Sequence, residues 1–230
     1  MAEREPGLVH NKDFRTMTIV RLQRTDEAFS NEEIESFIED GYDILGGGSM
    51  KTELLLRISE QTTCETCLSS CLIALLRYNG IKVNDSEELK IMIEGLKLTK
   101  LDYSTGQLAY VCDKYNVNIE QYVDYPIFYK ILSKLKYTKK LKLISKKVDM
   151  GFLKRLIKNS PIIVYMDKYY LDGIYHYSHF VILKSIGNRT SIILDPWDGK
   201  EKKIETALLI RSIQSLRNKL KISPKAIRIV

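Results

Sequence analysis

The segment from about Thr66 to Tyr78 is the part of the sequence that most restricts the possible fold. Drawn as a helix, it is apolar on most of its faces, and a helix of that kind has to be buried. Asn79 and Gly80 follow it directly, and this pair is a typical left-handed stop at a helix C-terminus. We therefore predict a buried helix that other elements cover on several sides.

Further helices are predicted before the middle of the chain, and strands are predicted after it. The runs NDSEELKIMIEGL and STGQLAYVCDKYNV have helical patterns, and the first can begin near Asp85 or Ser86. Apolar runs rich in β-branched residues come later, namely PIIVYM, HFVILKSI and SIILDP, and KAIRIV could be a last strand. TELLLRIS, ahead of the buried helix, indicates a strand or an extended arm. Helices first and strands later favour an α+β fold, with helices segregated from an antiparallel sheet.

The composition is that of an ordinary globular protein, since 44% of the residues are hydrophobic and 28% are charged. No apolar run approaches the length of a membrane span and no signal-peptide pattern opens the chain, so we expect a cytoplasmic protein. The four cysteines are too few for a disulfide framework, and a reducing compartment would keep them as thiols.

Charge is distributed unevenly along the chain. Residues 1–49 contain five basic and eleven acidic residues, a net charge of −6, whereas the whole chain has a net charge of +7. The stretch LGGGS just before Met50 is a flexible linker pattern. We therefore expect an acidic tail over residues 1–49, either natural or fused, and a separate folded domain over residues 50–230.

Two of the predicted strands place a histidine beside an aspartate. His179 begins the run HFVILKSI, Asp195 ends the run SIILD, and GNRT between them contains a turn signal. If the two runs form a hairpin, residue 195 pairs with residue 180 or with residue 182, depending on where the turn falls. Either register leaves His179 and Asp195 at the same end of the sheet, where a carboxylate can orient an imidazole through its second ring nitrogen.

A cysteine at the start of the buried helix is a candidate nucleophile. A nucleophilic cysteine needs thiolate character, which a helix N-terminus favours, and Cys67 lies at the expected N-terminus. Gln61 lies six residues earlier, where its side-chain amide could face a developing oxyanion, with the backbone N–H of Cys67 as the second donor. A histidine from a distant part of the sequence would complete such a site.

Together these motifs resemble those of the double-glycine leader peptidases, which are papain-like cysteine peptidases best known as N-terminal domains of bacteriocin-exporting transporters. The resemblance rests on Gln-x5-Cys followed by ALLRYNG, on SHFVIL and on LDPWDG, in that order, and covers about Leu54 to Gly199. It implies a papain-like α+β fold in which a helical half with the catalytic cysteine packs on an antiparallel sheet. No transporter follows in this sequence, so the chain would be a stand-alone relative.

The resemblance also implies a function, the hydrolysis of a peptide bond, with Gly-Gly as a candidate cleavage site and no cofactor or metal. It assigns Cys67 as the nucleophile, His179 as general base and acid, Asp195 as the orienting residue and Gln61 as an oxyanion donor. The family usually has Asp before and Gly after its cysteine, whereas this sequence has Thr66 and Leu68. Leu68 is expected to narrow the site, which puts the family's usual substrate in doubt.

The acidic tail is a candidate partner of the domain. In the resembled family, the leader is an amphipathic helix that docks on the peptidase and presents Gly-Gly to the cysteine. Within the tail, Ile34, Phe37 and Ile38 form an apolar stripe at helical spacing, and ILGGG follows. The expected partner is thus a peptide or protein substrate, such as an acidic amphipathic helix over residues 1–45, unless the tail contacts nothing.

Two other hypotheses stay open for the cysteines. Cys64, Cys67 and Cys71 share one helical face at the spacing C-x2-C-x3-C, and could hold zinc or an iron–sulfur cluster with Cys112 or His176 as a fourth ligand. Alternatively, the domain is peptidase-like and holds a peptide without cutting it. Without a metal, Cys71 and Cys112 are expected to be buried core thiols.

Rival assignments also exist for the nucleophile, the base and the partner. Cys64 is the rival nucleophile, although it is only three residues from Gln61. His176 is the rival base and is expected in an exposed loop. The lysine-rich stretch over residues 134–147 is expected to be a solvated face; it lacks the interleaved aromatic residues of a base-stacking surface, so nucleic acid is not an expected partner.

Overall fold

The computed structural model describes residues 56–99, 102–135 and 137–230, which all belong to one compact unit, Leu54–Val230. The expectations for the acidic tail, its amphipathic helix and its glycine linker lie outside these residues. Within the described part, none of the helices is long and apolar enough to cross a lipid bilayer.

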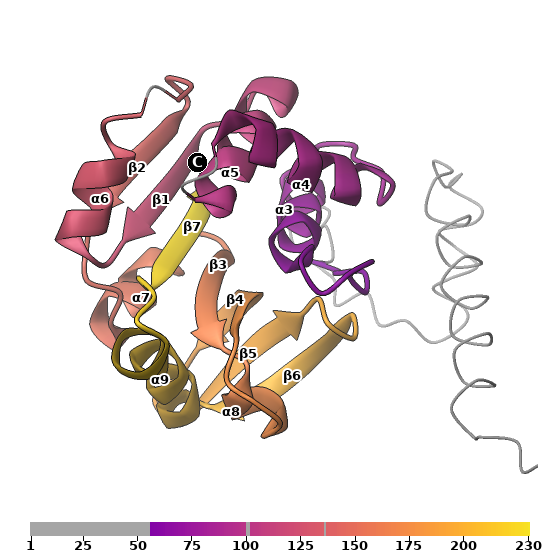
Figure 1. Ribbon diagram of the computed structural model, residues 1–230. Helices are drawn as coiled ribbons and strands as arrows, with labels where there is room; N and C mark the ends of the chain where they lie inside the picture. Colours follow the sequence, from indigo (N-terminus) through magenta and orange to yellow (C-terminus); the bar gives the residue numbers. More distant parts are fainter. Residues whose placement is uncertain (1–55, 100–101, 136) are drawn as a thin grey trace, which may run out of the picture. The chain divides into compact units, whose positions relative to one another are not determined.

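Three helices come first along the described chain, and the strands follow with further helices among them (Figure 1). The helices are α3 (Cys67–Tyr78), α4 (Glu87–Leu98), α5 (Tyr103–Tyr115), α6 (Pro126–Leu132), α7 (Met150–Leu156), α8 (Tyr169–Asp172) and α9 (Thr206–Ser215), and α9 continues into the π-helical segment η1 (Leu216–Leu220). The strands are β1 (Ile119–Val123), β2 (Leu141–Ser145), β3 (Ile162–Asp167), β4 (Ser178–Ile186), β5 (Thr190–Asp195), β6 (Lys200–Glu205) and β7 (Lys225–Ile229).

Comparison with the sequence-based expectations shows which elements were found. The three predicted helices are α3, α4 and α5, and the four predicted strands after them are β3, β4, β5 and β7. The sequence patterns missed β1, β2, β6 and the short helices between the strands. The described part of TELLLRIS, residues 56–59, forms no strand. The order of helices first and strands later was therefore too simple, because α6 to α9 lie among the strands.

One sheet joins all the strands of the described part, in the order β2-β1-β7-β3-β4-β5-β6. Its neighbouring strands are antiparallel, with the exception in the described chain of β1 and β2, which run parallel at one edge. Parallel neighbours need a crossover connection, and α6 lies in the connection between β1 and β2. The expected antiparallel sheet is thus correct from β1 to β6 in this order, and the parallel edge pair of β1 and β2 departs from it.

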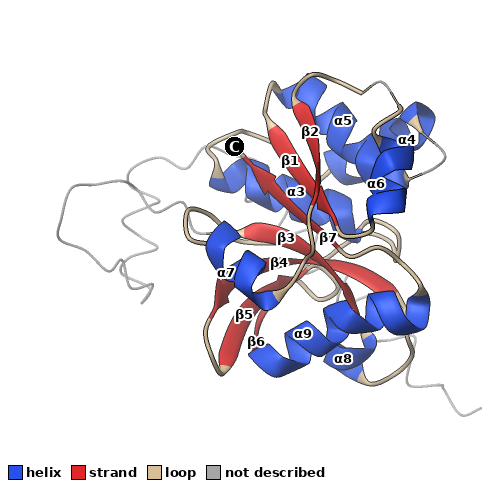
Figure 2. Ribbon diagram, turned by 90° about the vertical axis from the view of Figure 1, so that its left-hand side faces the viewer, coloured by secondary structure: helices blue, strands red, loops and turns tan. Residues whose placement is uncertain are grey.

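Alternate residues of the central strands pack into two apolar clusters, because successive strand side chains point to opposite faces of a sheet. Phe180 and Ile182 belong to a cluster with residues of α3 and α5. Val181 and Leu183 belong to a second cluster with residues of α7 and α9. Figures 1 and 2 show the corresponding arrangement, with α3, α4 and α5 together on one side and α7 and α9 on the other.

Helix α3 is as deeply enclosed as its sequence predicts. Every residue from Cys67 to Leu76 is buried, and Gly80 ends the helix with a left-handed φ of +77°. Residues of α3 share the first apolar cluster with residues of β3 and β4. The predicted α+β fold class is confirmed, since the helix that begins at Cys67 packs on the antiparallel part of the sheet.

Candidate active site

The hairpin expected to carry His179 and Asp195 is present. β4 and β5 are antiparallel neighbours. Beside the turn, Ile186 pairs with Ser191, which is the second of the two expected registers, the one that would pair residue 182 with residue 195. A bulge between Leu183 and Ser185 then shifts the pairing by one residue. As a result His179 lies near the start of β4, Asp195 ends β5, and the two side chains meet: the distance from Nε2 of His179 to Oδ1 of Asp195 is 2.7 Å.

Asp195 is fully buried yet ionised. Burial alone would raise its pKa, but the hydrogen bond and charge of His179, together with Lys202 and the backbone N–H of Trp197, hold the pKa well below its usual range. The N–H of Trp197 donates to Oδ1 at 3.0 Å, and Nζ of Lys202 donates to Oδ2 at 2.6 Å. Sequence analysis did not find Lys202, because β6 was not recognised as the neighbour of β5.

Cys67 opens α3 and its thiol is enclosed, with only 4% of the residue exposed. Burial raises the pKa of Cys67 to about 12, although nearby backbone N–H groups of Phe180 and Leu68 act in the opposite direction. Phe180 directly follows His179, so the sulfur lies near the start of β4, close to the backbone of the histidine. Among the described residues, no hydrogen bond joins the Cys67 sulfur to the His179 ring.

Gln61 is anchored to the same strand end. Its backbone N–H donates to the carbonyl oxygen of Pro196 at 2.7 Å, one residue after Asp195. Its side-chain Nε2 donates to the carbonyl oxygen of Thr63 at 2.6 Å, which leaves the second hydrogen of this amide for another acceptor. In the described structure, the buried Oε1 atom of Gln61 has no hydrogen-bond partner.

A carboxylate from α4 fastens the loop between Gln61 and Cys67. Glu88 is buried, which raises its pKa, and it accepts hydrogen bonds from the backbone N–H of Thr62 at 2.9 Å and from the Thr62 hydroxyl at 2.7 Å. Within the loop, the hydroxyl of Thr66 donates to the Thr63 carbonyl at 2.9 Å. The loop is therefore held at Thr62 by the carboxylate of Glu88 and at Thr66 by its bond to Thr63. Sequence analysis missed Glu88 because its contact joins segments that are distant along the chain.

The two positions that depart from the family pattern have structural roles here. Thr66 is fully buried, and its hydroxyl both accepts from the N–H of Thr63 and donates to its carbonyl. Leu68 is also fully buried, as part of the apolar cluster under α3. Leu68 was expected to narrow the site beside the cysteine. Its side chain is instead enclosed in the core and is not exposed next to the sulfur.

The rival cysteines lie in different surroundings. Cys64 is exposed in the loop, whereas Cys71 and Cys112 are fully buried in the core, as the sequence suggested. The Cys71 sulfur is 3.6 Å from the carbonyl oxygen of Phe180. Over the residues that the structure describes, there is no group of three or more His, Cys, Asp or Glu side chains that could hold a metal ion. The cysteine spacing does not produce a shared site for a metal in this fold.

The surroundings of His176 differ from the exposed loop that was expected for it. It does lie in the segment before β4, but it is half-buried rather than exposed, because its Nδ1 lies 2.7 Å from Oδ2 of Asp167. Its ring stacks on that of Tyr169, with centroids 4.1 Å apart. The carboxylate and the aromatic ring come from β3 and α8, two elements that a sequence pattern could not bring to this histidine.

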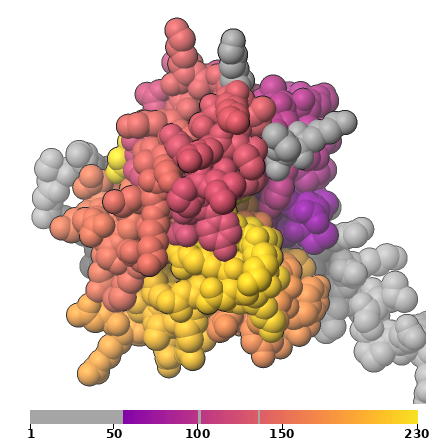
Figure 3. All heavy atoms as spheres, turned by 60° about the vertical axis from the view of Figure 1, so that its left-hand side comes forward, coloured from indigo at the N-terminus to yellow at the C-terminus, as the bar shows by residue number. Residues whose placement is uncertain are grey.

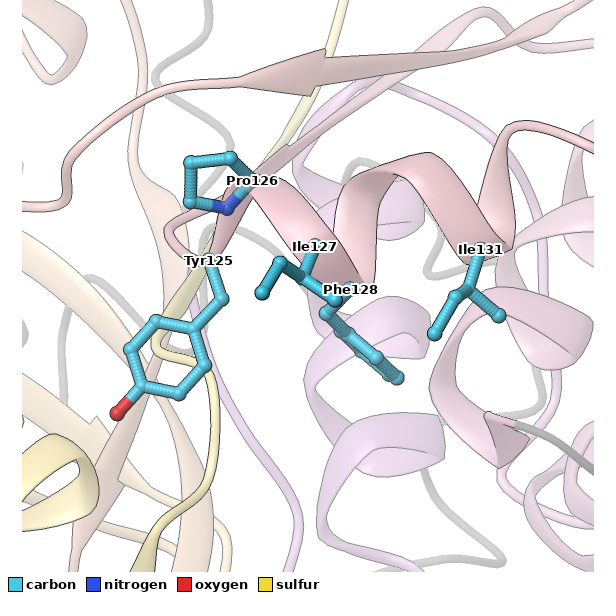
Figure 4. Close-up of a pocket in the computed structure, with 5 residues that line it drawn as sticks. All are labelled: Tyr125, Pro126, Ile127, Phe128 and Ile131. Atoms are coloured by element: carbon cyan, nitrogen blue, oxygen red, sulfur yellow. The ribbon is translucent and has the colours of Figure 1, made fainter.

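A pocket of about 410 Å³ lies elsewhere on the molecule, along α6. Figure 4 shows the apolar side chains that line it, Tyr125, Pro126, Ile127, Phe128 and Ile131. Helix α6 packs on β1 and β2, at the opposite end of the sheet from the hairpin. Figure 3 views this side of the molecule, with the segment around α6 and β2 above the yellow C-terminal segment.

In the lysine-rich stretch over residues 134–147, Lys139, Lys142, Lys146 and Lys147 are exposed, so this part of the stretch is a solvated face.

The chain matches no protein-family model and no curated protein sequence. Among solved structures, it is similar to a crystal structure from Bacillus anthracis that is provisionally described as a C39-like peptidase, with 14% sequence identity and a TM-score of 0.49. The match covers 76% of this chain and 94% of that chain.

Proposed function

We propose that this protein is a cysteine peptidase of the double-glycine leader peptidase type, with Cys67, His179, Asp195 and Gln61 as its catalytic residues. The observation that carries the proposal is the buried His179–Asp195 hydrogen bond at the strand end that also contacts Cys67 and Gln61. The same four residues that the sequence singled out, from three distant segments, thus converge on the ends of β4 and β5.

His179 is the base in this proposal, because the thiol cannot ionise unaided. Burial raises the pKa of Cys67 to about 12, so the thiol is almost entirely protonated at neutral pH. Nε2 of His179 faces Asp195, which leaves Nδ1 as the nitrogen that takes the thiol proton. Catalytic hydrogen bonds are often long in a free enzyme and shorten when substrate binds, so a direct bond to the sulfur is not required in this state.

The reaction then follows the order of acyl transfer. As the proton moves to His179, the sulfur attacks the carbonyl carbon of the substrate, and the oxyanion accepts from the Cys67 N–H and the second amide hydrogen of Gln61. The imidazolium returns its proton to the leaving amine, the C–N bond breaks and a thioester remains. Water, deprotonated by His179, attacks the thioester, and the acid product leaves as the proton returns to the sulfur.

A second candidate function, peptide binding without cleavage, is favoured by one observation. The Cys67 sulfur is enclosed and its pKa is raised, which is typical of an inert core thiol. In that case the domain would hold a peptide while the thiol stays protonated. The two candidates differ in one measurable outcome, which is whether a peptide bond is broken.

The acidic tail supplies the first substrate to test, because it carries Gly46, Gly47 and Gly48 ahead of the domain. We propose that the tail is a tethered partner of the basic domain, and that the substrate class is a peptide with an acidic amphipathic segment before Gly-Gly. Opposite charges promote such an encounter, and a short tether gives an effective concentration near the millimolar range, about enough to populate a weak contact.

The test is to follow the mass of the full-length chain during incubation, alone and with added Gly-Gly peptides of the same acidic pattern. A peptidase yields products cut after a glycine, and Cys67→Ser abolishes them. The matched control is Cys64→Ser, which should cut at the unaltered rate because the Cys64 side chain is exposed in the loop that precedes α3. Peptide binding with no cleavage by either chain would favour the second candidate and overturn the first.

A further inference from the structure

Lys202 holds the oxygen of Asp195 that the histidine does not use. Oδ1 of Asp195 accepts from His179 and from the N–H of Trp197, whereas Oδ2 accepts from Nζ of Lys202 at 2.6 Å. The carboxylate is fully buried, and the Lys202 side chain is 30% exposed. A buried carboxylate is stabilised only if its oxygens are paired, so Lys202 acts together with His179 to keep Asp195 ionised.

The strand register alone would favour Lys200, rather than Lys202, as the lysine that pairs with Asp195. Lys200 lies directly opposite Asp195, whereas Lys202 lies opposite Ile193, two residues further along. Lys202 nevertheless reaches diagonally to Asp195, and a second carboxylate, Asp198, holds its Nζ at 3.0 Å. Lys200 is exposed. The chain therefore offers two lysines near one aspartate, of which one is bonded to it.

We propose that Lys202 is a positioning residue of the active site, which fixes the Asp195 carboxylate toward His179. The proposal rests on the proposed function, in that His179 is the base it would tune. It extends the hydrogen-bonded chain from His179 through Asp195 to a cation on β6.

Two physical effects follow from this arrangement, and they have different signs for the imidazole. By holding Oδ2, Lys202 prevents the carboxylate from turning, so Oδ1 remains in line with Nε2 of His179 and fixes the tautomer with a free Nδ1. By sharing the negative charge, the ammonium reduces the stabilisation that Asp195 gives to a protonated ring. The first effect orients the base, and the second keeps it from being protonated too readily to accept the thiol proton.

Other charged and titratable groups lie around the pair, and the test has to separate them from Lys202. They are Asp198 from the turn before β6, Cys67 and Cys71 from α3, Asp172 from α8 with its partner Lys168, and Tyr177 from the segment before β4. Of these groups, the thiol of Cys67 exchanges a proton with His179 in the proposed reaction. Cys67→Ser removes this coupling, so the background for the test is the Cys67→Ser chain.

The experiment is an NMR titration of the histidine ring C–H resonances in the full-length Cys67→Ser chain. The chain has three histidines, so His176→Ala and His10→Ala suffice to assign His179. Lys202→Met removes one positive charge close to the ring, so the midpoint of the His179 titration should move up by about 0.5 to 1 pH unit. Lys202→Arg keeps the charge and should restore most of the original midpoint. Lys200→Met, the matched control, should move it little.

The outcomes separate the two proposals. An unchanged midpoint in Lys202→Met, in a variant that still folds, would overturn the positioning role whether or not the chain cuts peptides. An equal upward shift in Lys200→Met would reduce the effect to general surface charge and would also overturn it. If the midpoint moves as expected and is rescued by Lys202→Arg while the wild-type chain cleaves nothing, the chain from Lys202 to His179 stands and the peptidase proposal fails.

Discussion

Two histidine–aspartate pairs lie close together at the start of β4, and they have the same length. His179 and Asp195 are 2.7 Å apart, and so are His176 and Asp167. By distance alone, either pair could be an imidazole with its orienting carboxylate. The difference between them is in the atoms that remain free, and in what surrounds each ring.

In the His176 pair, both ring nitrogens are engaged. Nδ1 faces Asp167, and Nε2 contacts Nζ of Lys219 at 2.5 Å. A ring nitrogen that accepts from a lysine cannot also accept a proton from a nucleophile. In the His179 pair, Nε2 faces Asp195, and no hydrogen-bond partner of Nδ1 is found among the described residues. His179 therefore has the available nitrogen that a general base needs, and His176 does not.

The two aspartates also serve different neighbours. Asp167 accepts hydrogen bonds from the Ser215 hydroxyl at 2.6 Å and from the Tyr169 N–H at 3.1 Å. These bonds connect α9 and α8 to β3. Asp195 ends the strand beside Gln61 and Cys67, and it is held by Lys202. A short His–Asp distance therefore does not by itself identify a general base. A free second nitrogen next to a candidate nucleophile is the better criterion.

The largest expected effect comes from replacing each of the two aspartates, one at a time, with asparagine. Asp195→Asn should lower the rate of peptide cleavage by about 10⁴-fold, because an amide no longer fixes the tautomer with a free Nδ1 or stabilises the imidazolium. Asp167→Asn is the matched control and should change the rate by no more than a few-fold. Rates follow from product mass, and circular dichroism verifies that both variants fold. Similar losses in the two variants would remove the distinction between the pairs.

The sequence could predict the His179 pair because its determinants are local. Two apolar runs, a turn signal between them and a terminal Asp-Pro are enough to bring His179 and Asp195 to one end of a hairpin. The roles assigned to Cys67 and Gln61 remain predictions, although α3 does begin at Cys67. The position of the buried helix was predictable because its apolar residues cover most of its faces.

The partners of the second pair could not be predicted in the same way. His176 meets Asp167 through the pairing of β3 with β4, and meets Lys219 through a segment that follows α9. Lys202 belongs to KEKKIE, a polar strand at the edge of the sheet, where no apolar alternation marks the register. Contacts of this kind depend on tertiary packing, and they decide which histidine has a free nitrogen.

A smaller effect is expected at Gln61, the proposed oxyanion donor, which is bonded to the chain one residue after Asp195. Gln61→Ala should lower the cleavage rate by about 10²- to 10³-fold, the usual loss for one oxyanion donor. Glutamate at this position is a sharper variant, since Gln61→Glu keeps the size but removes the N–H and adds a negative charge. Thr62→Ala, a neighbouring loop change that loses only the hydroxyl bond to Glu88, should cost much less. A Gln61→Ala chain as active as wild type would remove Gln61 from the site.

The smallest effect is expected from His176→Ala. Asp167 keeps its bonds to Ser215 and to the Tyr169 N–H, and Lys219 can return to solvent, so the change should lower the free energy of unfolding by only about 1 kcal/mol. Urea denaturation measures this loss. The rate of Cys67 alkylation by iodoacetamide should stay within about twofold of wild type, whereas His179→Ala should lower it by about 10²-fold or more. If His176→Ala instead slowed alkylation and His179→Ala did not, the base would be His176, the orienting carboxylate would be Asp167, and the criterion of a free second nitrogen would be wrong for this protein.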